Sequence, residues 1–156
     1  MPERTRGKYY EELEVGDVYE HRPGRTVNEA DNTMWSLMTV NLQPLHLDAH
    51  HSEGTEFGER LVNSIFTLGV VTGMQVHDLT LGTTVANLGF EEISFPNPVF
   101  AGDTIYAETE ILDKRLSESR DDSGIVQFKH RGHNQDGDLI CECQRAALMY
   151  HEEALE

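Results

Sequence analysis

The chain has 156 residues, which is enough for one well-filled core and too few for two ordinary domains. We therefore expect a single domain over residues 1–156. Its formal net charge of −16 argues against nucleic-acid binding, because phosphate binding requires a basic surface. Lysine occurs only three times against 28 acidic residues, a balance that resembles the acidic surface of a protein adapted to high salt. On that hypothesis, low salt unfolds the protein.

The apolar segments do not indicate a membrane protein. The longest uncharged apolar run, residues 61–76, contains several polar side chains and is shorter than the roughly 20 residues of a membrane-spanning helix. No apolar stretch follows the basic start, so it does not look like a signal peptide, and we expect a cytoplasmic protein. Cys141 and Cys143 lie two residues apart in an alternating segment, which indicates reduced thiols on one strand face.

The first predicted elements are a short strand and a helix. The strand is expected over residues 17–22, before the turn "RPGR". The helix begins at "TVNE", residues 26–29, which has the pattern of a capping box. Its apolar positions recur at helical spacing and predict one inward face, made of Ala30, Met34, Leu37 and Met38. Asn41 lies three residues later and is expected on that same face.

The next segment, "NLQPLHLDAHH", is rich in histidine. "PLHLD" predicts an extended turn, because the proline disfavours helical angles at Gln43. Asp48 can then cap a short helix that contains His50 and His51. A zinc site formed by His46, Asp48 and His50 is disfavoured, because neighbouring loop positions rarely direct three side chains at one ion. We expect no metal.

The run "RLVNSIFTLGVVTGMQVHDL" predicts a helix that Ser64 or Asn63 caps. It is apolar on nearly every side through Val76, so other structure must surround it. Gly69 and Gly73 indicate a face that another backbone approaches closely.

From Thr84 onward the hydrophobic pattern has a period of two. Residues 105–112, "GIVQFKHRGHN" and "LICECQRAALMY" all alternate, and a turn at Asp136-Gly137 joins the last two. One apolar helix followed by four antiparallel strands predicts an α+β architecture in which a sheet curls around the helix. This arrangement is called a hot-dog fold.

Three segments resemble the MaoC-like enoyl-CoA hydratases. "YYEELEVGDVYE" is similar to the entry segment of that family, "NLQPLHLD" to its N-P-x-H-x-D catalytic corner, and "FPNPVFAGDTIYAETEIL" to its PV-x-x-GDT strand entry. The variant "NxQPLHxD", followed by "TEFGERLVNS", resembles the branch of mesaconyl-CoA hydratases, also called β-methylmalyl-CoA dehydratases. Members of that branch act on short branched dicarboxylic acyl-CoAs.

The resemblance implies reversible syn addition of water to a trans-2-enoyl-CoA. It implies no metal or redox cofactor, with coenzyme A as part of the substrate, and a homodimer or higher homo-oligomer joined edge to edge. His46 matches the catalytic histidine, and Ser64 matches the helix-opening glycine whose amide faces the thioester oxygen. A helix N-terminus suits a developing oxyanion. Asn63 matches the histidine before that glycine.

Asn41 stands where typical members of the family carry the catalytic aspartate. An amide cannot accept a proton at neutral pH, so two alternatives stay open. Either His46 alone shuttles the proton while Asn41 orients the water, or the protein has lost hydration and only binds an acyl thioester. Because Asn41 is typical of the resembling branch, we favour an active enzyme.

The remaining candidate residues concern substrate binding. Asn63, Arg60 and Gln43 lie beside the predicted site, and Arg60 can pair with a distal substrate carboxylate or, equally, with Glu56 or Glu59. The coenzyme A phosphates have candidate partners, each of which can instead form a solvated face with nearby acids: Lys114, Arg115, Arg120, Lys129 and Arg131.

Other functions are compatible with the same fold. A hot-dog thioesterase usually needs a carboxylate on or near the central helix, and none occurs between Arg60 and His77. A non-catalytic acyl-CoA-binding protein would keep the tunnel, and the domain could also be one partner of a larger assembly.

Overall fold

The computed structural model describes residues 6–155. The expectation that the chain has no signal peptide rests partly on residues 1–5, which lie outside the described residues. The strands are β1 (Val18–Thr26), β2 (Thr84–Ser94), β3 (Thr104–Leu116), β4 (Ser123–His133) and β5 (Leu139–Tyr150). The α-helices are α1 (Glu29–Met38), α2 (Pro44–Leu47), α3 (Ala49–Glu53) and α4 (Ser64–Gly73). Short helical turns are η1 (Tyr10–Glu12), η2 (Val76–Thr80) and η3 (Glu152–Leu155). None of the helices described is long and apolar enough to cross a membrane.

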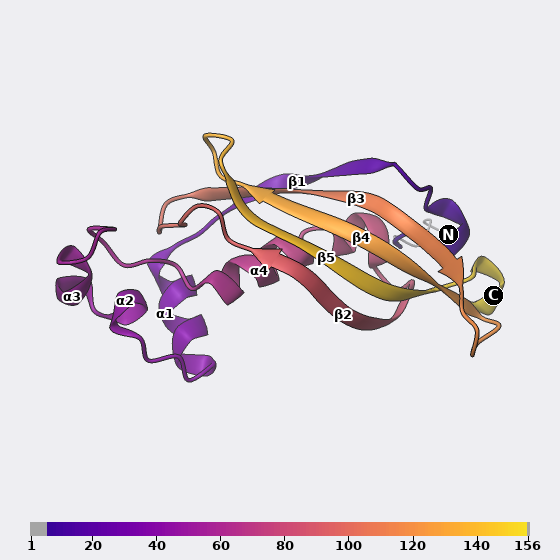
Figure 1. Cartoon of the computed structure of the whole chain (residues 1–156), viewed down its shortest axis with the longest axis horizontal. Helices are drawn as coiled ribbons and strands as arrows, with labels where there is room; N and C mark the ends of the chain where they lie inside the picture. Colours follow the sequence, from indigo (N-terminus) through magenta and orange to yellow (C-terminus); the bar gives the residue numbers. More distant parts are fainter. Residues whose placement is uncertain (1–5, 156) are drawn as a thin grey trace, which may run out of the picture.

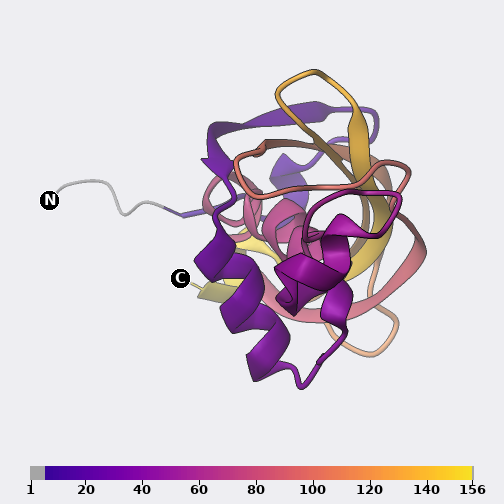
Figure 2. The same ribbon diagram turned by 90° about the vertical axis from the view of Figure 1, so that its left-hand side faces the viewer.

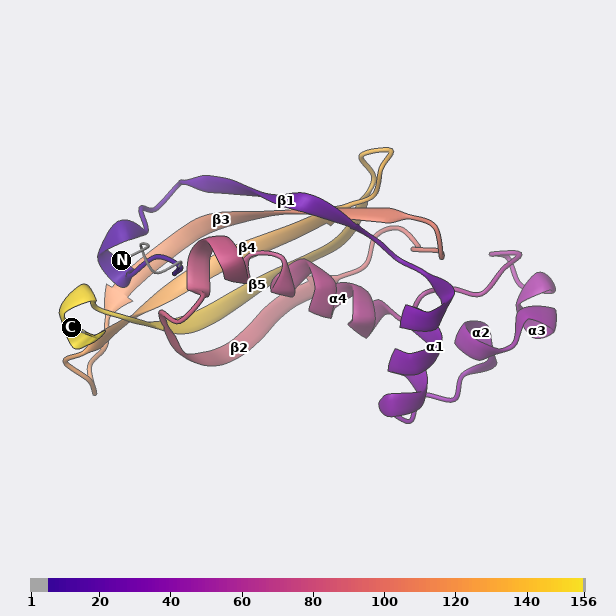
Figure 3. The same cartoon turned by 180° about the vertical axis from the view of Figure 1, so that it is seen from behind.

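The five strands form one antiparallel sheet in the order β1-β3-β4-β5-β2 (Figure 1). Helix α4 lies across its concave side, as the view from behind shows (Figure 3). Helices α1 to α3 gather beyond one end of the sheet, at the end of α4 where that helix begins (Figure 2). The predicted α+β architecture, with a sheet curled around an apolar helix, is therefore confirmed.

The period-two pattern predicted the second half of the chain well. Strands β4 and β5 match the two alternating segments, and Gly137 in the turn between them has a φ of 84°, which favours glycine. Cys141 and Cys143 are free and fully buried on the inward face of β5. Burial raises the pKa of the two thiols to about 12 and about 11, so both remain protonated.

Two apolar clusters lie on the inner face of the sheet. One packs α4 on the sheet and contains Val71 and the two cysteines. The other contains Leu13, Phe128 and Leu79, of which Leu79 belongs to η2. Between the clusters runs a row of buried polar side chains, one from each of four neighbouring strands. The row consists of His21, Thr109, His130 and Arg145.

Hydrogen bonds connect this polar row from end to end. Arg145 Nε lies 3.1 Å from His130 Nε2, and His130 Nδ1 lies 2.8 Å from Thr109 Oγ1. Thr109 Oγ1 lies 2.8 Å from His21 Nε2, and His21 Nδ1 lies 2.8 Å from Asp78 Oδ2. Because a guanidinium only donates, Arg145 donates to His130 Nε2, and His130 Nδ1 then donates to Thr109. Because a carboxylate only accepts, His21 Nδ1 donates to Asp78.

The chemistry of the row agrees with that assignment. Burial, together with the nearby charge of Arg145, lowers the pKa of His130 to about 3, so its ring is neutral and can accept from Arg145. Asp78 is partly exposed. Burial raises the pKa of its carboxyl, but hydrogen bonds with His21 and His77 outweigh that effect and hold the pKa below the usual value.

The orientation of α1 differs from the sequence prediction. Strand β1 extends to Thr26, and the cap of α1 is Asn28, whose side chain accepts from Asp31 N; the proposed capping box at residues 26–29 is wrong. Asn32 and Ser36 are buried, whereas the predicted inward face is exposed, with Met34 60 % and Met38 73 % accessible. The helix packs against backbone groups that need polar partners, so its polar stripe turns inward.

The loop after α1 also differs in part. "PLHL" forms the short helix α2 with Pro44 in its first turn, a position where proline is favoured, and not an extended turn. Val40, with a φ of 59°, and not Asn41 adopts the left-handed conformation that follows α1. Asp48 caps α3 through His51 N, as predicted.

Helix α4 is shorter and less covered than expected. Asn63 is its cap and Ser64 its first residue, and a separate turn, η2, follows from Val76. A Cβ added at Gly73 would meet no atom of another element within 4 Å, and one added at Gly69 would meet only a ring atom of Trp35. The predicted close backbone approach at the two glycines is therefore absent within the described chain, and this face of α4 lies open.

We expect the substitution Thr109→Val to destabilise the protein by roughly 2–4 kcal/mol, because it keeps the side-chain shape but leaves buried ring nitrogens of His21 and His130 without their partner. Chemical denaturation would measure the change. Thr104→Val is the matched control, since its hydroxyl bonds to Thr26 at an exposed position, and should change stability by less than about 0.5 kcal/mol. Equal effects of the two substitutions would contradict a structural role for the polar row.

Candidate active site

His46 lies in α2 with only 9 % of its surface exposed. Its Nδ1 lies 2.7 Å from the carbonyl oxygen of Leu61, three residues before α4 begins. A carbonyl oxygen can only accept, so Nδ1 carries the proton in the neutral ring and Nε2 keeps a free lone pair. The structure thus fixes the orientation of the ring beside the entrance of α4.

A single buried amide, Asn32 of α1, connects the segments around that histidine. Its Nδ2 donates to the carbonyl oxygens of Leu61 and His46, at 3.0 and 3.2 Å, and its Oδ1 accepts from Asn63 N at 2.9 Å. Ser36, one turn further along α1, accepts from Asn63 Nδ2 at 3.4 Å. Asn32 and Ser36 therefore hold the histidine segment against the first turn of α4.

Sequence reasoning missed both of these residues. They are four apart on α1, so a polar stripe at helical spacing was visible in the sequence. The stronger apolar spacing of Met34, Leu37 and Met38 favours the opposite face.

Ser64, the first residue of α4, lines a cavity. Asn63 Oδ1 accepts from Ile65 N at 3.0 Å, while Ser64, half-buried, lines a hollow of about 270 Å³ with apolar walls that include Phe57, Val62 and Phe95. Amides in the first turn of a helix have no carbonyl partner within the helix and carry its positive dipole end. An oxygen with negative charge would be stabilised here. Asn63 itself is 2 % exposed and bound at both ends of its side chain.

Asn41 and Gln43 precede the histidine, in the loop before α2. Asn41 is half-buried, and its Oδ1 accepts from Gln43 N at 3.2 Å, which leaves its Nδ2 group as a donor. Gln43 is exposed, and its carbonyl accepts from His46 N at 3.0 Å. The backbone of Gln43 therefore joins the side chain of Asn41 to the backbone of His46.

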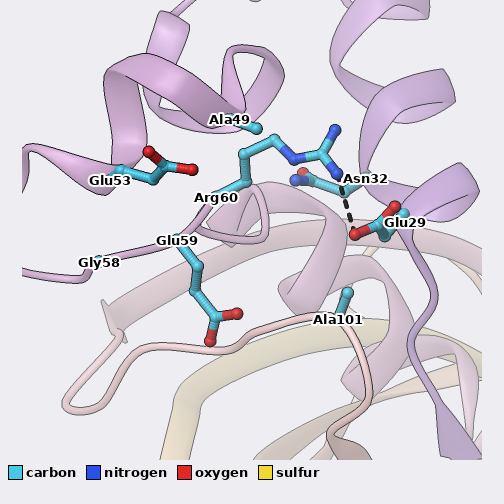
Figure 4. A pocket seen from close by; sticks show the side chains of 8 residues that line it. All are labelled: Glu29, Asn32, Ala49, Glu53, Gly58, Glu59, Arg60 and Ala101. Atoms are coloured by element: carbon cyan, nitrogen blue, oxygen red, sulfur yellow. Dashed lines mark ion pairs between the residues drawn. The ribbon is translucent and has the colours of Figure 1, made fainter.

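Arg60 lies in a different hollow, of about 150 Å³ (Figure 4). It forms an ion pair of 2.9 Å with Glu29 of α1, and not with Glu56 or Glu59 as expected. Glu53 and Glu59 line the same hollow. With its charge compensated and further carboxylates nearby, this arginine is poorly placed to attract a substrate carboxylate.

Three of the candidate partners of the coenzyme A phosphates pair with acids. Arg120 pairs with Asp122, and Lys129 and Arg131 pair with three glutamates on the outer face of the sheet: Glu108, Glu110 and Glu142. His50 is 99 % exposed, 3.9 Å from Glu53. Within residues 6–155 no group of three or more His, Cys, Asp or Glu side chains could hold a metal ion.

Comparison with known proteins gives this geometry a context. Residues 11–132 match the family model of the MaoC like domain. The chain belongs to the MaoC-like domain family. The matched region includes α4, the histidine loop and most of the sheet, so the resemblance noted in the sequence is confirmed.

Individual relatives agree with that assignment. The mesaconyl-CoA hydratase of Haloarcula marismortui is 27 % identical over 94 % of this MaoC-like chain, which spans 41 % of that relative's length. A MaoC-like dehydratase structure from Rhodospirillum rubrum is 26 % identical with a TM-score of 0.82, and the match covers 94 % of this chain and 99 % of that one.

A Mycobacterium tuberculosis protein with a double hotdog fold supports the fold alone. It matches 94 % of this MaoC-like chain with a TM-score of 0.81 and 21 % identity, over 45 % of its own length. The hot-dog fold predicted from the sequence is confirmed.

We expect Asn32→Asp to lower the free energy of unfolding by about 2–4 kcal/mol at neutral pH, because it directs a carboxylate oxygen at the carbonyls of Leu61 and His46. Denaturant titration would measure the loss. The control is Asn97→Asp, which removes a comparable bond of 2.8 Å to Leu139 O at an exposed position and should cost less than about 1 kcal/mol. A silent Asn32→Asp variant would mean that the amide does not hold the site together.

Proposed function

We propose that this MaoC-like domain is an enoyl-CoA hydratase, a hydro-lyase that adds water reversibly to a short, possibly branched or dicarboxylic, enoyl-CoA such as mesaconyl-CoA. The main support is the fixed His46 ring, whose free Nε2 lies on a segment bonded to the entrance of α4. The named activities of the relatives, hydratase and dehydratase, support the reaction class.

In the proposed mechanism, His46 Nε2 takes a proton from water as the water oxygen bonds to the β-carbon. The double-bond electrons move toward the thioester, and the resulting oxyanion is held by the Ser64 amide and the dipole of α4. The imidazolium then returns a proton to the α-carbon, which restores the neutral ring. One water adds across one double bond, and no separate carboxylate is needed.

Asn41 is assigned a supporting role in this mechanism. Its Oδ1 is engaged by Gln43 N, so the free Nδ2 hydrogens are available to position the attacking water. We assign a substrate contact to Gln43, and we expect the substrate to lie beside Asn63. We assign no cofactor beyond the coenzyme A of the substrate, and we place the protein in the cytoplasm.

We further propose that two copies associate through their sheet edges. Strand β2 is an edge strand with exposed Leu88, Phe90 and Ile93, and an unpaired apolar edge is avoided in stable proteins. The exposed apolar face of α1 also needs a cover. A relative of about twice the length has a double hotdog fold, so its second half would occupy the place of a second copy here.

We expect His46→Ala and His46→Gln to lower the turnover of crotonyl-CoA by about 10²–10⁴-fold, because each removes the proton carrier. Absorbance of the enoyl thioester would follow the reaction. Glutamine can still donate to Leu61 O, so it separates chemistry from folding. His50→Ala, at an exposed site in the same segment, is the control and should retain wild-type turnover.

The same assay distinguishes the alternatives. Release of free thiol from crotonyl-CoA or mesaconyl-CoA would identify a thioesterase, and binding without either signal would identify an acyl-CoA-binding protein. Hydration that survives both His46 substitutions would reject the assigned base.

We expect Asn41→Ala to reduce kcat by about tenfold with little change in KM, because the amide would orient water without binding the acyl group. Steady-state kinetics with crotonyl-CoA would measure both constants. If kcat stays at the wild-type value, Asn41 is only a turn residue that binds Gln43 N.

A further inference from the structure

Thr67 carries a buried hydroxyl whose hydrogen bond is not supplied by the described part of the chain. It lies in α4, three residues after Ser64, and only 1 % of its surface is exposed. Its Oγ1 atom is buried and has no hydrogen-bond partner among residues 6–155. Burying a hydroxyl in this way is costly, so the group calls for an explanation.

The usual partner of such a hydroxyl is within the same helix. A helical threonine can donate to the carbonyl oxygen four residues earlier. Thr72 of α4 does so, since its Oγ1 donates to Leu68 O at 2.8 Å. The equivalent acceptor for Thr67 is Asn63 O, which accepts the backbone N–H of Thr67 at 3.2 Å but not its hydroxyl. Thr67 therefore holds its hydroxyl away from the local acceptor that Thr72 uses.

Thr67 lines the same hollow of about 270 Å³ as Ser64. Residues three apart lie on one face of a helix, and helical side chains lean toward the N-terminus. The Thr67 side chain therefore covers the turn that Ser64 begins. The third polar residue of the wall, Asn97, is exposed and donates to Leu139 O at 2.8 Å. No charged residue lines this hollow in the part of the chain that the structure describes.

The first turn of α4 has few donors left for a ligand. Ile65 N donates to Asn63 Oδ1 at 3.0 Å, and Thr67 N is engaged as described above. The proposed function therefore gives the thioester oxygen one named donor, the Ser64 amide. Oxyanion sites combine backbone amides with side-chain donors. A hydroxyl has one hydrogen to donate and can rotate to meet an acceptor, so Thr67 can be the second donor.

We propose that the Thr67 hydroxyl donates a hydrogen bond to the thioester oxygen beside the Ser64 amide. This role rests on the proposed function for the position of the thioester, and it adds a catalytic residue to that site. The oxygen gains negative charge as water adds to the double bond, so the bond from Thr67 is strongest in the transition state. The ligand then satisfies the hydroxyl that the protein leaves without a partner.

The substitution Thr67→Val separates this role from a structural one, because valine keeps the shape and removes the hydroxyl. We expect an equal or higher midpoint of thermal unfolding, since no hydrogen bond to the described residues is lost. We also expect kcat for crotonyl-CoA to fall by about 10²-fold, with a smaller change in KM. Thermal unfolding and the enoyl absorbance would measure the two effects.

Two further variants serve as controls. Thr67→Ser keeps a hydroxyl at the same position and should retain most of the wild-type turnover. Thr72→Val removes a hydroxyl whose bond lies within α4, so turnover should stay at the wild-type value. A purely structural role of Thr67 predicts the opposite pattern for Thr67→Val, with a lower unfolding midpoint and unchanged turnover.

Infrared spectroscopy tests the same hydrogen bond without turnover. The probe is butyryl-CoA labelled with ¹³C at the thioester carbonyl, which has no double bond to hydrate. Hydrogen-bond donors lower the stretching frequency of a carbonyl, and two donors lower it more than one. We expect the band of the bound probe to lie below its position in water for wild type and Thr67→Ser. In Thr67→Val the band should return part of the way.

The possible outcomes are distinct. Equal turnover of wild type and Thr67→Val, or an equal carbonyl band in the two proteins, would overturn the role of Thr67 and leave the proposed hydration standing. A Thr67→Val protein that is less stable or does not fold would also overturn it, because the hydroxyl would then have a structural partner. If crotonyl-CoA is not hydrated but the carbonyl band depends on Thr67, the hydration fails and the donor stands. If butyryl-CoA does not bind, both fail.

Discussion

The entrance of α4 depends on one buried amide. The chain arrives at this helix through residues 61–63, and Asn32 binds the backbone at both ends of that segment as well as the carbonyl of His46. Buried backbone groups cannot remain unpaired, so this set of bonds fixes where α1, α2 and α4 meet. The tautomer of His46 and the direction of the first α4 amides both follow from that meeting point.

The same requirement explains why α1 exposes its apolar residues. A helix in a bundle buries its apolar stripe, but this one covers a junction of polar backbone groups and so buries Asn32 and Ser36. Met34 and Met38 then face outward, where a second copy can cover them. The geometry of the site and the exposure of these methionines are thus consequences of one helix orientation.

The sequence predicted the sheet and the central helix because their signals are local. Alternation determines which residues of β4 and β5 face inward, and the long apolar run determines α4. The inward face of α1 was predicted wrongly, since apolar spacing does not reveal what a helix packs against. For the site, the loop motif located His46, and its role remains a proposal. Asn32 escaped prediction because its partners lie far away in the sequence.

The polar row across β1, β3, β4 and β5 has a consequence for strand alignment. Apolar side chains on neighbouring strands tolerate many pairings, and a slip of one residue exchanges the two faces of a strand. Thr109 lies directly opposite His130, so a shifted β4 would bury a donor and an acceptor with no counterpart. The polar row therefore favours the native register of β4 against β3 over registers shifted by one residue.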